Sequence, residues 1–495
     1  MPRGLRQSPV SRKKNALERA VIELTETLRP AFPDTRVFER VRRLALGMLT
    51  AEDRRTITSL LEATGRSDCD WSSDYRVFSR GVWEPSELFS RLLPSILELH
   101  PKDEKRVVAS LDDTNIRKTG THIPGVAYRR DPMSPPFQAN LIRAQRFVQT
   151  SIAIPFGAGA TAARAVPVAF DHAPSAGKLC KDATEEQKQS HREQQLLCSL
   201  PTYANVAIKQ LRSSLDAAAA KEKQLLMAID GSYTNGKVLT KLPERTDAIG
   251  RIRKDAVLHG LPVLDGQKGR PRLYGTKITP EQVRQDDAIP WRSVKIFGAG
   301  RVHDCDIKEV TPLLWRKTGS TLRLRLIVIR PLAYRRSKTS RLLYRQPAYL
   351  ITTDHHSTLE ELVQAYFWRW DIEVNHRDEK QLIGVGQAQV RSPKSAQRVP
   401  AFAVICYSLL LISAANTFGL AATAPVTDRP KWLRSASQKR TRLSTRELMR
   451  RLQTEHRGHP FDPPNYDHFA RNVARSMKSP KSAVTLNAAL QHALN

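Results

Sequence analysis

The sequence predicts an α/β protein in which a mixed-sheet core follows a helical N-terminal region. Apolar residues recur at helical spacing through residues 1–105. Two short apolar runs, residues 107–111 and 225–229, have the length and composition of buried strands, and an aspartate follows each of them. Residues 357–384 form a longer segment with the pattern of a helix. Strands that alternate with helical segments in this way are typical of an α/β core.

The charge of the chain indicates a polyanionic partner. Its 495 residues include 80 Lys and Arg but 49 Asp and Glu, which gives a formal net charge of +31. Basic side chains gain affinity for nucleic acid by releasing the counterions that condense on phosphates. A membrane is the less favoured partner, because no basic amphipathic segment stands beside a hydrophobic span. We therefore expect a protein that binds nucleic acid and has no membrane partner.

The cysteines and the N-terminus favour the cytoplasm. The five cysteines are scattered and never form a C-x-x-C pair, which argues against a zinc module and against a disulfide framework. The first residues lack the apolar stretch of a secretory signal. A reducing, cytoplasmic location is the expectation.

The N-terminal region, residues 1–105, is expected to be an all-α domain. Helical apolar spacing occurs in residues 16–28 and again in residues 37–49. Thr50 with Asp53 three positions later is a helix start signal, so a further helix is expected from there.

The rest of the chain divides into four segments by amino-acid composition and apolar pattern. We assign residues 106–259 to a first part of the core and residues 260–345 to an insertion. Residues 346–424 form the second part of the core, and residues 425–495 form a basic helical tail. Residues 260–320 are polar, with Pro, Gly and Lys in mixture, which predicts many loops. Residues 322–329 alternate basic and apolar residues, as a half-exposed strand does. In the second core part, Ser357 with Glu360 predicts a capping box at the start of the long helix.

Three acidic residues are the candidate catalytic and metal-binding groups. Asp112 and Asp230 follow the two predicted strands, and Glu373 lies on the long helix. Carboxylate oxygens are the ligands that Mg²⁺ prefers, and two such ions can clamp the attacking and leaving oxygens of a phosphoryl transfer. Taken singly, an aspartate after a strand is more often a turn former or a helix cap. Together with the helix, the acids favour metal-assisted phosphoryl transfer with two Mg²⁺ ions, for which Mn²⁺ could substitute.

The long helix carries a charged stripe. At about 100° per residue, one face spanning about 60° presents Tyr366, Arg369, Glu373 and Lys380. The structural alternative is an ordinary ion pair four residues apart, Arg369 with Glu373. The same helix also carries several large apolar residues, so much of it must be buried. A buried helix with concentrated charge indicates a ligand.

The spacing of these residues resembles the YREK signature of bacterial DDE transposases in the insertion-sequence-four superfamily. The segments 369–373 and 380–384 are similar to the same family, as are the segments around the two aspartates, 111–114 and 229–233. The resemblance covers residues 106–405, and the four-residue helical signature is its most specific part.

The resemblance implies an RNase H-like catalytic domain with a β-rich insertion, which residues 260–345 would supply. It implies that Asp112, Asp230 and Glu373 hold the metal ions. The family pattern Asp-x-Thr selects Asp112 rather than its neighbour Asp113, which stays the second candidate. Tyr366, Arg369 and Lys380 would contact the DNA.

Four residues are weaker candidates. Arg251 and Arg253 follow the second acid and could grip the DNA backbone, although an exposed charged turn is an equal alternative. Trp291 and Trp315 lie in the insertion, where relatives use an aromatic residue to stack a flipped base. Packing in the core is the alternative for both.

The function expected from this resemblance is that of an insertion-sequence transposase. Such a protein binds the terminal inverted repeats of a transposon, and we expect the helical N-terminus to make that contact. It acts as a homodimer that cuts the DNA and joins it to target DNA. The basic tail would add non-specific affinity, and the bacterial nucleoid is the expected location. The alternatives are an RNase H-like nuclease that does not join strands and a DNA-binding regulator with a degenerate catalytic domain.

Overall fold

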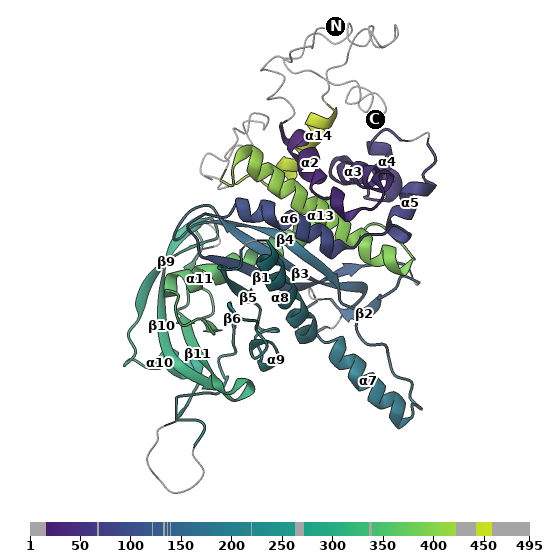
Figure 1. Ribbon diagram of the computed structural model, residues 1–495. Coiled ribbons are helices and arrows are strands. Elements are labelled where there is room, and N and C mark those ends of the chain that lie inside the picture. Colours follow the sequence, from purple (N-terminus) through teal and green to yellow (C-terminus); the bar gives the residue numbers. More distant parts are fainter. Residues whose placement is uncertain are drawn as a thin grey trace.

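The computed structural model describes residues 16–457, except for residues 67–68, 121, 132–133, 136, 139, 219, 263–271, 336–338 and 422–441. One large mixed sheet carries helices on both faces and is extended at one end by long strands (Figure 1). This mixed α/β architecture agrees with the predicted fold class and fits an RNase H-like catalytic domain.

The described part of the N-terminal region consists of helices and their connections. These are α2 Ala16–Glu26, the 3-10 turn Arg29–Ala31, α3 Thr35–Thr50, α4 Ile57–Ala63, α5 Ser72–Ser79 and α6 Pro85–Glu98. The helix expected to start at Thr50 begins instead after Thr56, whose hydroxyl accepts the backbone N–H of Ser59. That prediction was wrong because Thr50 is the last residue of α3, where its hydroxyl donates to the carbonyl of Leu46.

The first six strands are arranged around β1, which lies between β3 and β5. β1 pairs antiparallel with β3 and parallel with β5, β6 lies parallel to β5, and β2 and β4 pair with the other edge of β3. The expected end of the first strand at residue 111 was wrong, because β1 continues beside β3 after β5 has stopped. The bounds are β1 Arg106–Arg117, β2 Ala127–Arg130, β3 Leu141–Pro155, β4 Ala163–His172, β5 Gln224–Ile229 and β6 Thr246–Arg251.

Residues 260–320 contain long strands, so the loop-rich structure expected there was wrong, whereas the strand expected at residues 322–329 is confirmed as part of β11. Strands β9 and β10 alternate charged and apolar residues, which is the pattern of half-exposed strands and lowers their apparent hydrophobicity. β11 pairs with β14, and β14 pairs with β6, so the insertion continues the main sheet. The elements are β7 Leu258–His259, β8 Lys277–Ile278, α10 Pro280–Gln285, β9 Arg292–Gly298, β10 Arg301–Trp315, the 3-10 turn Arg316–Thr318, β11 Gly319–Ile329, β12 Ala333–Tyr334, β13 Leu343–Tyr344 and β14 Ala348–Thr352.

The remaining helices connect or cover the sheet. The predicted long helix is present but divided into α11, α12 and a π-helical segment, η3. Their bounds are α7 Glu185–Leu197, α8 Leu200–Ala217, α9 Gly236–Leu239, α11 Leu359–Trp368, α12 Trp370–Asp378, η3 Glu379–Ile383, α13 Pro393–Phe418 and α14 Thr445–Arg457.

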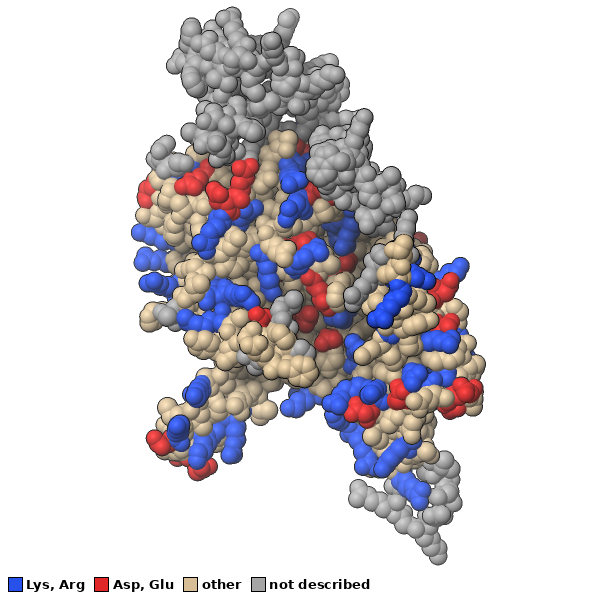
Figure 2. All heavy atoms as spheres, turned by 180° about the vertical axis from the view of Figure 1, so that it is seen from behind, with Lys and Arg blue, Asp and Glu red and all other residues tan. Residues whose placement is uncertain are grey.

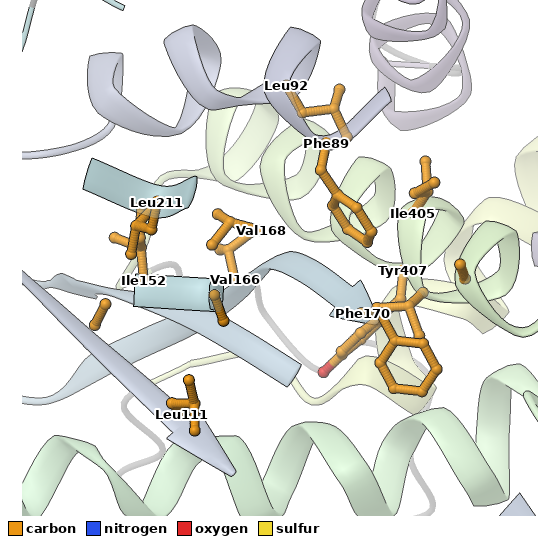
Figure 3. Close-up of a cluster of buried hydrophobic side chains, with 14 of the residues drawn as sticks. Phe89, Leu92, Leu111, Ile152, Val166, Val168, Phe170, Leu211, Ile405 and Tyr407 are labelled. Atoms are coloured by element: carbon orange, nitrogen blue, oxygen red, sulfur yellow. The ribbon is translucent and has the colours of Figure 1, made fainter. Parts of the chain in front are cut away.

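The helix α13 links the N-terminal helices to the sheet. The ring of Phe402 on α13 makes edge contacts with the rings of Phe78 and Trp83 in the N-terminal region. In the close-up of Figure 3, side chains of α6, β4 and α13 meet in one cluster, with Phe89, Phe170 and Ile405 among those labelled. The helices of residues 16–98 therefore share a hydrophobic core with the main sheet, whereas the assigned boundary at residue 105 stays a prediction.

By length and composition, α13 could cross a membrane, but 94% of its most apolar window is buried inside the protein. Burial on all sides explains why the helix is apolar all round.

The tail is described only between residues 442 and 457; residues 425–441 and 458–495 lie outside the described part. Helix α14 buries Leu448, Met449 and Leu452, and it packs on α2 and α3. Removing the whole tail would therefore expose part of the core as well as removing charge.

A conservative change in α13 tests whether the shared core makes one cooperative unit. Ile405→Val removes one methylene from a fully buried side chain and should lower the free energy of unfolding by about 0.5–1.5 kcal/mol. Circular dichroism and intrinsic fluorescence should report the same single transition in urea. Two transitions, with only one moved by the substitution, would contradict the shared core.

Candidate active site

Asp112 and Asp230 lie beside each other in the middle of the sheet. Leu111 of β1 and Ile229 of β5 are register partners on adjacent parallel strands, and each aspartate comes next in its chain. β5 ends at Ile229, so Asp230 enters a turn, whereas Asp112 continues in β1 opposite Gln149 of β3. Burial and the neighbouring Asp113 raise the pKa of Asp112 to about 7. The two aspartates therefore lie on adjacent strands in the interior of the sheet, at the point where β5 ends.

Asp113 faces other partners. Its carboxylate accepts a hydrogen bond of 2.9 Å from the hydroxyl of Tyr233, and it interacts electrostatically with Arg129. Successive strand residues point to opposite faces of a sheet. Asp112 interacts instead with Asp230 and Arg369, so the charged helix lies on the side of Asp112.

The helix that carries the charged stripe begins one residue later than expected. Thr358 and Glu361 form its capping box, not Ser357 and Glu360. The predicted capping box was wrong because the Ser357 hydroxyl donates to the carboxylate of Asp354, so it is not free to cap the helix.

Contacts at several points fix the position of this helix. The Gln364 side chain exchanges hydrogen bonds with the backbone N–H and carbonyl of Phe297 on β9. The Trp368 indole donates to the carbonyl of Thr161, and the Asn375 amide donates to the Ser151 hydroxyl. The stripe is thus held against the sheet from both sides of the break at Arg369.

Arg369 lies at the centre of the charged group. Its Nη2 is 3.3 Å from Glu373 Oε1, and its guanidinium lies 5.6 Å from the centre of the Tyr366 ring. Burial opposes its charge, but Tyr366 and the surrounding carboxylates outweigh burial and raise its pKa. The Arg369 Nε is buried without a hydrogen-bond partner in the described protein. The Arg369 Nε–H is therefore available to donate a hydrogen bond to a ligand.

Glu373 and Lys380 complete the charged group from the same helix. Burial raises the pKa of Glu373, although the nearby Arg369 acts in the opposite direction. Lys380 belongs to η3, where the π-helical turn changes the rotation that a regular helix would give, and it interacts electrostatically with Asp112 and Asp113. The structure therefore brings Asp112, Asp230, Tyr366, Arg369, Glu373 and Lys380 into one electrostatically coupled group.

The donor set of this group suits a hard divalent cation. Asp112 and Asp230 provide carboxylate oxygens side by side, and neither forms an ion pair with a basic side chain in the described part of the chain. Glu373 is turned to Arg369, and among the described residues no three His, Cys, Asp or Glu groups already surround one point. The two aspartates thus fit Mg²⁺ or Mn²⁺ as they stand, and Glu373 would have to exchange Arg369 for the metal.

A basic cleft adjoins the acids. It has a volume of about 1430 Å³, and it begins at Gly231, directly after Asp230. Arg251, Lys254 and Lys277 form no ion pair within the described residues. Figure 2 shows Lys and Arg side chains gathered on the lobe at its lower right, which the insertion forms. The basic residues that line the cleft are Arg251, Arg253, Lys254, Lys277, Arg284, Arg316 and Lys317.

The weaker candidates have different surroundings. Arg251 is exposed at the end of β6, whereas Arg253 makes a two-pronged ion pair with Asp255. Trp315 is 6% exposed in the core beside the cleft. Trp291 is half-buried, with the Lys308 ammonium 4.6 Å from its ring centre.

Sequence reasoning missed most of the cleft. Arg316 and Lys317 follow Arg251 by more than sixty positions, and strand pairing in the insertion brings them to the same cleft. The only local signal was the pair of adjacent basic residues at the end of an apolar stretch.

One comparison with known families gives a match. A family model described as DDE superfamily endonuclease matches residues 27–320, a span that includes Asp112 and Asp230 and ends before the charged helix. The search of curated proteins found no match to the chain.

Proposed function

Because the chain belongs to the DDE superfamily endonuclease family, we propose that it is the transposase of an insertion sequence of the insertion-sequence-four type. It would bind transposon ends, nick the DNA and join the freed 3′-OH to target DNA. The observation that carries this proposal is the coupled group around Arg369, in which three acids lie with a guanidinium, an ammonium and a phenol. Acids alone would suit any metal-dependent nuclease, whereas the added cations suit a reaction that must hold a cut DNA end.

Asp112, Asp230 and Glu373 would hold Mg²⁺, which when bound activates the attacking oxygen and stabilises the leaving oxygen. The chain's own residues then have separate tasks. Arg369 offers its unpartnered Nε and, once Glu373 has turned away, its Nη2 to a phosphate of the cleaved strand. Lys380 and Tyr366 flank that phosphate and fix its orientation. Positioning of this kind is the main contribution that a protein makes to phosphoryl transfer.

A strand-transfer assay tests the proposal. A duplex that carries the element's end with an exposed 3′-OH is incubated with the protein, Mg²⁺ and supercoiled plasmid. Joined product is expected, and it should disappear with EDTA. Nicks without joined product would favour the simple nuclease, and binding without nicks would favour the regulator.

The basic cleft is the proposed path of the DNA beside the cut. Arg251→Ala with Lys317→Ala should weaken binding to a random-sequence duplex. Each lost phosphate contact should reduce the slope of log K against log salt by about 0.9. The matched control is Lys102→Ala, because Lys102 is exposed just before β1, at the opposite end of that strand from Arg117. Equal effects in the cleft variant and the control would contradict a specific path through the cleft.

A further inference from the structure

The segment between β4 and α8, residues 173–199, leaves the body of the protein and returns to it. Figure 1 shows α7 of this segment extending away from the sheet beyond the end of α8. None of its thirteen residues is buried, and its largest set of contacts is with α8, which follows it directly. We call residues 173–199 the arm.

The two ends of the arm are fixed at one point. Arg146 of β3 donates from Nε to the carbonyl of Ala173 at 2.9 Å and from Nη2 to the carbonyl of Cys198 at 3.1 Å. The Tyr203 hydroxyl donates to the carbonyl of Pro174. One guanidinium thus closes the base of the arm, so the arm is a supported projection and not a frayed connection.

Helix α7 buries none of its residues against the described protein. A helix of 12–15 residues is marginally stable alone in water, and a capping box at Thr184 and Gln187 supplies only part of what is missing. Leu196 and Leu197 are 59% and 67% exposed at the end of α7, and Val206 on the adjacent α8 is 48% exposed. Neighbouring exposed apolar residues on a projection mark a protein contact.

The charge of the arm argues against DNA as its partner. Residues 173–199 hold four basic and four acidic residues, a net charge of zero, in a chain with a net charge of +31. The acids Glu185 and Glu186 occupy the first turn of α7. Both signs of charge are visible on the projection at the lower left of Figure 2. The acids of this first turn are complementary to a basic protein surface, and every copy of this chain has such a surface.

We propose that the arm packs against a second copy of this chain and holds two catalytic domains together. The choice of a second copy as the partner rests on the proposed function, because cutting and joining both ends of an element requires two active sites in one complex. Reciprocal contact of two arms, each with the body of the other copy, gives a closed two-fold assembly. The apolar end of α7 supplies the buried area, and its acids face the basic body of the partner.

Sedimentation velocity of the full chain tests the arm, alone and with a random-sequence duplex. Because Arg146 holds both ends of the arm, residues 185–196 can be replaced by a short Gly-Ser linker without separating Ala173 from Cys198. The wild type should be a dimer, and this variant should be a monomer with an unchanged melting temperature, because α7 has no buried residue. Leu196→Arg with Leu197→Arg should behave in the same way, and Val82→Arg, at a residue 74% exposed outside the arm, should remain a dimer.

Several outcomes would overturn the proposal. A wild type that is monomeric under both conditions, or a variant without the arm that still dimerises, excludes the arm as the contact between copies. A lower melting temperature without a change in mass would show that the arm is covered by another segment of its own chain. Nicking activity is measured on the same samples. If the wild type never nicks DNA but the variant without the arm is a monomer, the proposed function is refuted and the arm contact stands. If the variant without the arm is a dimer that nicks DNA, the arm contact is refuted and the proposed function stands.

Discussion

Asp112→Asn, Asp230→Asn and Glu373→Gln should each lower the rate of Mg²⁺-dependent nicking by about a thousandfold or more. Metal ions contribute several kcal/mol of transition-state stabilisation, and each 1.4 kcal/mol corresponds to about tenfold in rate. Each substitution replaces one carboxylate oxygen by an amide nitrogen of similar size, so folding and DNA binding should persist. Single-turnover nicking and a gel-shift measurement on the same preparations check both parts.

Asp113→Asn is the matched control for the acids. Asp113 is adjacent to Asp112 in the same strand, but its carboxylate accepts from Tyr233. Its substitution should slow nicking far less than that of Asp112. The reverse order would move the metal site to Asp113, and full activity in Glu373→Gln would remove the helix from the catalytic assignment.

Arg369→Ala should slow nicking and strand transfer by about a hundredfold, the effect of misplacing a reacting group by about 1 Å. Arg369→Lys should remain impaired, because an ammonium does not replace a planar fork that binds phosphate in a bidentate way. Single-turnover rates and melting temperatures are measured together. Mn²⁺ binding should be retained, since Arg369 is not a metal ligand.

Arg377→Ala separates this role from helix stability. Arg377 lies on the same helix and forms an ion pair with Asp378, but its side chain is 58% exposed. An exposed ion pair of this kind contributes about 0–1 kcal/mol, so nicking should be nearly normal. If Arg369→Ala melts early yet nicks at the wild-type rate when folded, then Arg369 is structural and the positioning role is wrong.

The strands and the charged helix were predictable because their signals are local. An apolar run next to an aspartate located β5 and Asp230, and a four-residue spacing located Arg369 and Glu373 on one helix. The position of Lys380 around the helix axis was less predictable, because the π-helical turn of η3 departs from the regular α-helical spacing. The capping residue was misplaced because Asp354, which binds Ser357, competes for its hydroxyl through a contact that pattern matching ignores.

The surroundings of the site depend on long-range pairing, and local patterns do not carry that information. Half-exposed strands in the insertion have mixed composition, so β9 and β10 were read as loops. The basic cleft combines residues from β6, the β10–β11 connection and α10. The contact of α13 with the N-terminal helices joins residues more than three hundred positions apart, as in the pair Phe78 and Phe402.

Mn²⁺ binding to the DNA-bound protein, measured by electron paramagnetic resonance, tests the central claim most directly. The wild type should bind Mn²⁺, and Asp230→Asn should lose that binding while still holding DNA. Arg369→Ala should bind Mn²⁺ as the wild type does. Equal Mn²⁺ binding by the wild type and Asp230→Asn would contradict a metal site at the paired acids of β1 and β5.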